Sequence, residues 1–199
     1  KNAVFGRFSS TMPGRHNAMN ALAVIAVLDL RGMDADNIAD QLILFKGVRR
    51  RQEVRGVERG VTVIDDFAHH PTAVKETLLS LRAAYAGSRL VAVFEPRTNS
   101  SRRNISQDDY AKVFNGADEI LIKEPIPLEN IDEGLRFSSK KLVDDLVAQS
   151  LHASYFPTTD AILDHLDSSL EQGDVVAIMS NGGFDNIHTR LLAILAAPK

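Results

Sequence analysis

Short apolar segments alternate with amphipathic segments along most of the chain. Five apolar segments have the length and composition of buried strands: residues 61–67, 89–94, 119–122, 152–156 and 174–179. Between and after them, apolar residues recur every three or four positions, which predicts helices over 72–85, 110–115, 138–150, 159–170 and 184–196. Strands separated by helices indicate βαβ units. We therefore predict an α/β fold with a Rossmann-like, mostly parallel sheet flanked by helices.

Two further helices are expected ahead of the sheet, over residues 18–30 and 34–44. Gly32 is expected to end the first helix, and the Asp34 side chain to cap the second. Residues 52–57 are predicted to form an additional edge strand. The chain begins without Met and shows no clear period at its start, which we interpret as a cut point inside a longer protein.

The composition narrows the classes of function. The 23 basic and 26 acidic residues give a formal charge of −3, which argues against a nucleic-acid or membrane partner attracted by bulk charge. The absence of Cys excludes disulfides, a thiolate nucleophile and Cys-ligated zinc. No apolar stretch approaches the ~20 residues of a transmembrane helix. We expect a cytoplasmic protein.

Polar residues follow four of the predicted strands. In an open parallel sheet, ligands bind outside the carboxyl ends of the strands. We call the loops at these ends the polar edge, and they are residues 68–71, 95–100, 123–127 and 180–183. Their His, Arg, Asn and Pro residues indicate a rigid binding site.

The segment Asp65–Pro71 carries the densest candidate chemistry. Its carboxylates and imidazoles could bind a metal ion, but Asp65 and Asp66 point to opposite faces of a strand and cannot easily share one ion. Alternatively, one carboxylate accepts a hydrogen bond from a ribose hydroxyl and a His guides the substrate. A third interpretation is that this turn merely caps the following helix.

Four other groups of residues could bind a ligand, and three of these groups also have a structural interpretation. Arg49–Arg51 could bind phosphate or form a solvated turn. The side chains of Arg97 and Asn99 can bind a carboxylate. The turn Ser180–Gly183 precedes a helix and favours an anion, or is only a tight connection. Asn17 and Asn20 lie on one side of a helix and could contact a base, or Asn17 could cap that helix.

Five segments together resemble the Mur ligase family, whose members are ATP-dependent peptide-bond-forming enzymes of bacterial cell-wall synthesis. They are GRHNAMNALA, GVRRRQEV, DDFAHHPTA, EPRTNS and MSNGGFDNIH. The last two are similar to those of the ligases that join UDP-N-acetylmuramate to the recycled murein tripeptide L-alanyl-γ-D-glutamyl-meso-diaminopimelate. Asp185 and Asn186 stand where that resemblance leads us to expect Gly-Gly, and Ser101–Arg103 also differ.

The resemblance implies where the domain boundary lies and which domain binds which ligand. Residues 47–199 would be the C-terminal Mur ligase domain, and residues 1–46 the end of the central ATPase domain with connecting helices. The UDP-binding and phosphate-loop domains would lie upstream, and the central domain would hold most of the Mg²⁺ ligands. The 199 residues alone would be inactive.

The resemblance also implies a mechanism and a set of site residues. ATP would phosphorylate the muramate carboxylate, and the peptide amine would attack the acyl phosphate. The residues expected on the ATP side are Asn17, Asn20, Arg51 (with Arg50 as the next candidate) and Asp66. Those expected to position the peptide are His69, His70, Arg97, Asn99, Ser180, Asn181, Gly182 and Gly183. We assign no catalytic residue and no metal ligand within the chain.

Several alternative functions remain open at this point. The L-alanine-adding members of the family share the DD-aromatic-x-HHP pattern. Folate polyglutamate ligases share the architecture, although HHP and EPRTN point away from them. Outside the family, Asp66, His69 and His70 could serve a metal-dependent hydrolase. A non-catalytic binding module is the last possibility.

Overall fold

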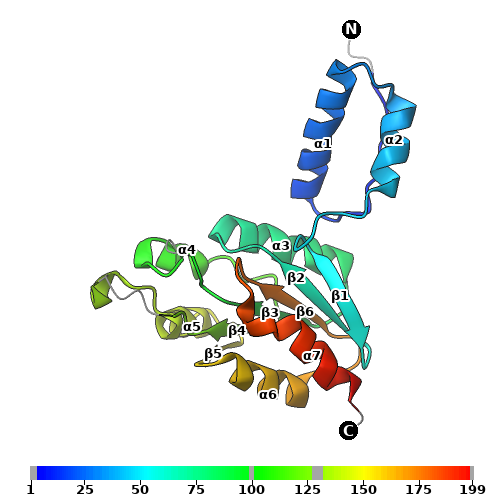
Figure 1. The fold of residues 1–199 in the computed structure, drawn as a ribbon. Coiled ribbons are helices and arrows are strands. Elements are labelled where there is room, and N and C mark those ends of the chain that lie inside the picture. The colour runs from blue at the N-terminus through cyan, green and yellow to red at the C-terminus, as the bar shows by residue number, and fades with distance from the viewer. Residues whose placement is uncertain (1–3, 99–100, 127–131, 198–199) are drawn as a thin grey trace. The chain divides into compact units, whose positions relative to one another are not determined.

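The computed structural model describes residues 4–98, 101–126 and 132–197, and Figure 1 shows its fold. Its centre is a six-stranded sheet of order β1-β2-β6-β3-β4-β5. The strands are β1 (Glu53–Glu58), β2 (Val61–Asp66), β3 (Leu90–Phe94), β4 (Glu119–Lys123), β5 (Ala153–Phe156) and β6 (Val175–Met179). β1 pairs antiparallel with β2, and all other pairs are parallel. The predicted strands, the edge strand included, are confirmed.

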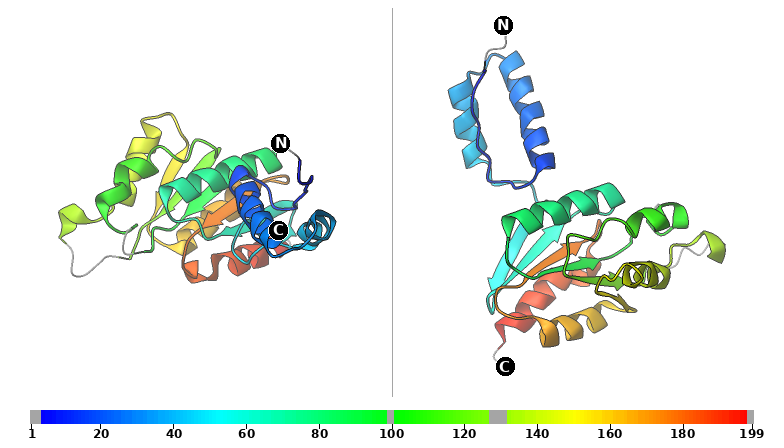
Figure 2. Two further views of the ribbon diagram at one scale, coloured as in Figure 1. Left: turned by 90° about the horizontal axis from the view of Figure 1, so that it is seen from above. Right: turned by 180° about the vertical axis from the view of Figure 1, so that it is seen from behind.

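Helices cover both faces of this sheet (Figure 2). On one face lie α3 (Pro71–Ala84), α4 (Gln107–Tyr110) and α5 (Ser139–Val147), and on the other lie α6 (Thr159–Ser169) and α7 (Ile187–Ala196). Alternate residues of the strands enter two separate apolar cores, one beneath each set of helices. Because β3 and β6 are buried on both faces, they are continuous apolar runs. The predicted α/β class is confirmed.

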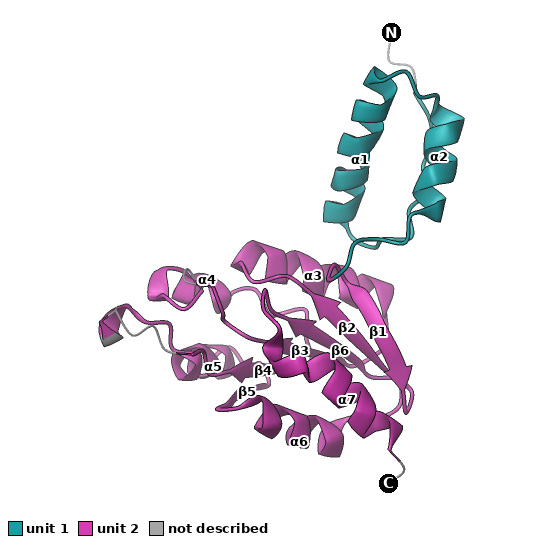
Figure 3. Ribbon diagram, in the orientation of Figure 1, with its two compact units in different colours: residues 1–49 teal, residues 50–199 magenta. Residues whose placement is uncertain are grey.

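Two units divide the chain, residues 1–49 and 50–199 (Figure 3). The first unit contains α1 (Arg15–Leu30) and α2 (Ala35–Leu44), which pack against each other. Gly32 follows α1 with a φ of 85°, a conformation that glycine adopts without strain. Asp34 caps α2, since its Oδ1 accepts a hydrogen bond of 3.0 Å from the backbone N–H of Asn37. The roles of Gly32 at the end of α1 and of Asp34 at the start of α2 were both predicted.

One predicted helix, over residues 110–115, is wrong. The helix α4 ends at Tyr110, and residues 111–115 form turns and bends. Immediately after these turns, the backbone at Gly116 passes close to α3. A Cβ built on Gly116 would lie only 3.1 Å from the Cβ of Leu78. The chain therefore turns here in order to pass α3 and enter β4.

The C-terminal helix begins later than predicted. Phe184, Asp185 and Asn186 form a short 3-10 segment, but their φ angles are 44°, 49° and 55°. These left-handed conformations are uncommon for residues other than glycine, so α7 starts only at Ile187. Two other short 3-10 segments are Asn104–Ser106 and Glu133–Leu135.

Candidate functional site

The carboxyl ends of four strands meet at the polar edge, as predicted. Met179 at the end of β6 pairs in register with Asp66 on one side and with Phe94 on the other, and Phe94 pairs with Ile122. The loops that follow β2, β6, β3 and β4 therefore start side by side (Figure 1). Segments separated by more than a hundred residues thus supply one continuous row of polar side chains.

A buried ion pair lies at the centre of the polar edge. Lys123 Nζ is 3.1 Å from Glu95 Oε1, and the hydroxyl of Ser180 donates a 2.7 Å hydrogen bond to Glu95 Oε2. The Glu95 and Lys123 side chains are only 3% and 9% exposed. Burying two charges is tolerated when they are paired and hydrogen-bonded, as they are here. Sequence reasoning placed both residues at the polar edge but gave neither of them a role.

Arg97 lies against the glycine turn that follows β6. Its Nη1 is 3.8 Å from Glu95 Oε2, and a Cβ on Gly182 would stand 2.0 Å from the Arg97 Cδ. A side chain at position 182 would therefore displace Arg97 from its place on this turn. In the same turn, Asn181 Oδ1 is buried and has no hydrogen-bond partner among the described residues. A buried acceptor without a partner is rare in folded proteins and marks a place where a ligand could donate a hydrogen bond.

Arg50 links the turn after β6 to the start of the domain through hydrogen bonds. Its Nη2 donates to the backbone carbonyls of Ser180 at 2.6 Å and Gly182 at 2.8 Å. Its Nε lies 3.3 Å from Asp65 Oδ1. Arg50 is thus committed to contacts inside the domain, whereas Arg51 is exposed and lies 5.5 Å from the centre of the Phe67 ring. Of the two arginines, Arg51 has the guanidinium better placed to meet a phosphate.

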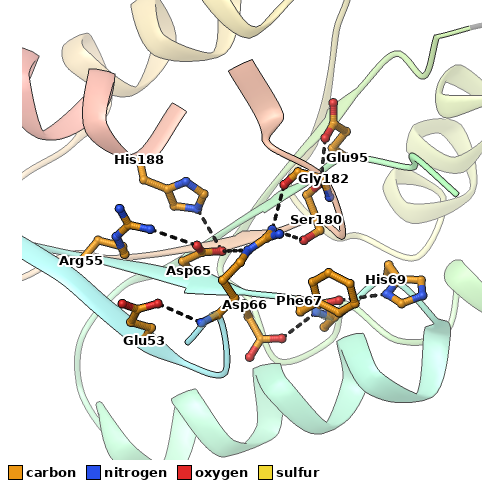
Figure 4. A network of polar contacts seen from close by, with 12 residues as sticks. Glu53, Arg55, Asp65, Asp66, Phe67, His69, Glu95, Ser180, Gly182 and His188 are labelled. Carbon is orange, nitrogen blue, oxygen red and sulfur yellow. Dashed lines mark hydrogen bonds and ion pairs between the residues drawn. The ribbon is translucent and has the colours of Figure 1, made fainter. Parts of the chain in front are cut away.

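Asp65 points to the face of the sheet that carries α7. Its carboxylate lies 3.3 Å from Arg50, Arg55 and His188 (Figure 4). Burial alone would raise the pKa of Asp65, but the contacts with His188 and Arg50 outweigh it and keep the pKa below its usual value. Asp65 is therefore an anion that helps to fix Arg50.

Asp66 points to the opposite face, as the strand alternation predicted. Its Oδ2 accepts a 2.9 Å hydrogen bond from the backbone N–H of Gln52, and its Oδ1 accepts one of 2.7 Å from that of Ala68. Burial raises the pKa of Asp66, and these hydrogen bonds partly oppose the rise. The side chain braces the turn after β2. Each carboxylate oxygen can accept a second hydrogen bond, but Asp66 is only 3% exposed, so a ribose hydroxyl could reach it only if the turn moved.

The two histidines after β2 have different surroundings. His69 is half-buried with its Nδ1 2.9 Å from the carbonyl of Phe67, and its own carbonyl accepts a hydrogen bond from the Tyr110 hydroxyl. His70 is exposed and caps α3, with its Nδ1 3.4 Å from the backbone nitrogen of Thr72. The capping interpretation is therefore confirmed for His70. Across residues 4–98, 101–126 and 132–197, no three His, Asp or Glu side chains gather as metal ligands, so the hydrolase alternative gains no support.

Two of the remaining predicted site residues belong to the first unit, and a third is not described. Asn17 is buried within the first unit, where its amide donates a 2.7 Å hydrogen bond to the carbonyl of Pro13, and Asn20 is exposed. Gly14, not Asn17, caps α1. Asn99 lies outside the described residues. No helix in the described part of the chain is long and apolar enough to cross a membrane.

Comparison with known proteins identifies the class to which this α/β domain belongs. The family model described as "Mur ligase, glutamate ligase domain" matches residues 49–182. The match covers the sheet from β1 to β6 and most of the polar edge. The chain belongs to the Mur ligase family and contains the C-terminal domain of such a ligase.

Two kinds of ligase stand among its relatives. The chain is 38% identical over 194 residues to the UDP-N-acetylmuramate–L-alanyl-γ-D-glutamyl-meso-2,6-diaminoheptandioate ligase of Escherichia coli, covering 96% of this chain and 40% of that protein. It is 37% identical over 187 residues to the UDP-N-acetylmuramate–L-alanine ligase of Caldanaerobacter subterraneus, and the match covers 94% of this chain and 40% of that protein. The chain therefore spans about two fifths of the length of these curated relatives.

Solved structures show the same two kinds. A murein peptide ligase from Psychrobacter arcticus matches with a TM-score of 0.72 and 35% identity, over 96% of this chain and 39% of that one. The UDP-N-acetylmuramate-alanine ligase of Thermotoga maritima matches with a TM-score of 0.78 and 24% identity, over 94% of this chain and 39% of that one. The second match shows the fold alone.

Proposed function

We propose that the full-length protein joins UDP-N-acetylmuramate to the murein tripeptide L-alanyl-γ-D-glutamyl-meso-diaminopimelate in an ATP-dependent reaction. Residues 47–199 are proposed as its C-terminal domain, and residues 1–46 as the end of the central ATPase domain. One observation carries the proposal: the Arg97 side chain lies against Gly182, beside the buried Glu95–Lys123 ion pair. This arrangement presents a cation at the polar edge, and the tripeptide carries several carboxylates.

The proposed reaction has two steps. Phosphoryl transfer from ATP to the muramate carboxylate gives an acyl phosphate and ADP. The peptide amine then attacks the acyl carbon and loses a proton, phosphate leaves, and an amide remains. Both steps depend mainly on positioning and on stabilisation of negative charge, so they need few reacting side chains in this domain.

We assign the site residues of the chain to two of the three substrates, ATP and the tripeptide. On the nucleotide side, Arg51 would approach the γ-phosphate, Asn17 and Asn20 the adenine, and Asp66 the ribose. We assign the ligands of Mg²⁺ mainly to the central domain. On the amino side, the peptide would meet the polar edge, where its carboxylates face Arg97 and its donors face the unpartnered Oδ1 of Asn181. The other proposed contacts there are His69, His70, Asn99, Ser180, Gly182 and Gly183.

A second candidate is UDP-N-acetylmuramate–L-alanine ligase. The 37% identity to a relative of that name favours it about as much as the 38% identity to the tripeptide-adding relative favours the first. The two functions differ in the size and charge of the amino substrate. They therefore make different demands on the polar edge.

Steady-state kinetics of the full-length protein separates the two candidates. With UDP-N-acetylmuramate and ATP present, phosphate release and the ligated product are measured for the tripeptide and for L-alanine. We expect kcat/KM for the tripeptide to exceed that for L-alanine at least about a hundredfold. A preference for L-alanine would assign the second function. Residues 1–199 alone should show no turnover, and robust turnover would contradict a site divided between domains.

A further inference from the structure

Two places in the chain carry the dipeptide Asn-Gly, the sequence most prone to spontaneous deamidation. They are Asn115–Gly116, between α4 and β4, and Asn181–Gly182, after β6. In this reaction the backbone nitrogen of the glycine attacks the side-chain carbonyl carbon of the asparagine, and ammonia leaves. Glycine favours the attack because it has no Cβ to hinder the approach. The structure gives the two dipeptides opposite surroundings.

Asn115 and Gly116 occupy the two central positions of a β-turn. The turn is closed by a 2.9 Å hydrogen bond from the backbone N–H of Ala117 to the carbonyl of Phe114. This bond uses neither of the central N–H groups, and within the described part of the chain the Gly116 N–H donates no hydrogen bond. Asn115 is exposed, so water reaches its side chain. The attacking nitrogen is therefore free, and ammonia can leave into solvent.

Asn181 and Gly182 are held against the same reaction. The Gly182 N–H donates a 3.0 Å hydrogen bond to the hydroxyl oxygen of Ser180. Arg50 Nη2 donates to the carbonyls of Ser180 and Gly182, the residues on either side of Asn181. The Oδ1 of Asn181 is buried. Ring closure at Asn181 would have to break several of these contacts first.

We propose that Asn115 is the site at which this protein deamidates spontaneously, and that the turn after β6 protects Asn181. Attack by the Gly116 nitrogen on the Asn115 side chain closes a succinimide ring and breaks the bond to the amide nitrogen. The proton of the Gly116 N–H passes through water to the departing ammonia. A second water molecule then opens the ring at either carbonyl, which gives aspartate or isoaspartate. This modification is independent of the ligase reaction.

Isoaspartate at position 115 disturbs the packing that follows it. It places one additional carbon in the main chain directly before Gly116, where a Cβ would already lie only 3.1 Å from the Cβ of Leu78. The Gly116 carbonyl also accepts a 3.1 Å hydrogen bond from Arg82 Nε, and Arg82 pairs with Asp118. Because the main chain cannot lengthen here without shifting these contacts, isoaspartate lowers the stability of the domain. Aspartate at the same exposed position changes it little.

Ageing of the purified 199-residue chain in mildly alkaline buffer tests the assignment. Trypsin cleaves after Lys112 and Lys123 and releases Asn115 in one short peptide, whose aspartyl and isoaspartyl forms chromatography separates. Mass spectrometry follows the conversion at Asn181 in parallel. We expect Asn115 to deamidate about tenfold or more faster than Asn181 in the folded chain, since charged hydrogen bonds must open first at Asn181. In guanidinium chloride the two rates should converge.

Two variants separate the reaction from its consequence. Asn115→Gln keeps an amide that closes a ring far more slowly, and Asn115→Asp introduces the charge without lengthening the main chain. The isoaspartyl form, isolated from aged wild type by ion exchange, should have a urea midpoint roughly 0.5 M or more below that of fresh protein. Aged Asn115→Gln and fresh Asn115→Asp should both unfold close to fresh wild type.

Three results would overturn the proposal. The first is deamidation at Asn181 as fast as at Asn115 in the folded chain. The second is the same difference in rate in guanidinium chloride, which would assign the difference to sequence and not to structure. The third, an unchanged midpoint of the isoaspartyl form, would refute the disturbance of packing at Gly116.

Discussion

Replacing Arg50 with Met should destabilise the C-terminal domain far more than its position in a surface turn suggests. The change removes two hydrogen bonds to the carbonyls of Ser180 and Gly182 and one ion pair with Asp65. Asp65 is buried and, among the residues that the structure describes, would keep Arg55 and His188 as its only charged partners. Breaking a buried charged contact of this kind costs about 3–5 kcal/mol in the free energy of unfolding.

Urea unfolding of residues 1–199 measures this effect. With a slope of about 2 kcal/mol/M, the midpoint of Arg50→Met should fall by roughly 1.5–2.5 M. The control is Arg51→Met, because Arg51 is exposed and its ring contact with Phe67 is worth only about 0.5–1 kcal/mol. Arg50→Lys should lie between wild type and Arg50→Met, since it keeps the charge but not the fork of two donors. Equal midpoints for Arg50→Met and Arg51→Met would refute the role given to Arg50.

Two further predictions concern the same part of the molecule. Because the folded-state pKa of Asp65 lies below its usual value of 3.8, its contribution is present above that pH and is lost as the pH falls through the folded-state pKa. The difference in unfolding free energy between wild type and Asp65→Asn should therefore be largest near pH 7 and shrink in acid, and a difference independent of pH would contradict this assignment. In the full-length protein, Gly182→Ala should raise KM for the amino substrate about tenfold or more with little change in KM for ATP, because its Cβ collides with Arg97. Gly183→Ala, whose Cβ meets no atom within 4 Å, should move that KM far less, and similar effects of the two substitutions would argue against the collision.

The sheet and its two layers of helices could be predicted because their signals are local. Continuous apolar runs such as residues 90–94 require burial on both faces, and the apolar period of residues 72–85 fits one side of a helix. The failure over 110–115 has a tertiary cause, since the chain must turn there to pass α3 at Gly116. No short window of sequence contains that constraint.

The site was predictable as an edge of the sheet but not as a set of contacts. Glu95 and Lys123 are 28 residues apart, and their pairing follows from the order of β3 and β4. A signal did exist, because each is a charged residue at the end of an otherwise apolar run. The different roles of Arg50 and Arg51 depend on the left-handed backbone at Arg50, with a φ of 57°. A cluster of three arginines does not reveal which one turns inward.

Hydrogen exchange of the full-length protein tests most directly whether the polar edge receives the amino substrate. The protein is saturated with UDP-N-acetylmuramate and a non-hydrolysable ATP analogue, and exchange is compared before and after addition of the tripeptide. We predict slower exchange in residues 67–70, 95–98 and 180–187, and no change in 59–61 and 170–174 at the opposite edge. Slower exchange confined to segments outside the polar edge would contradict the account.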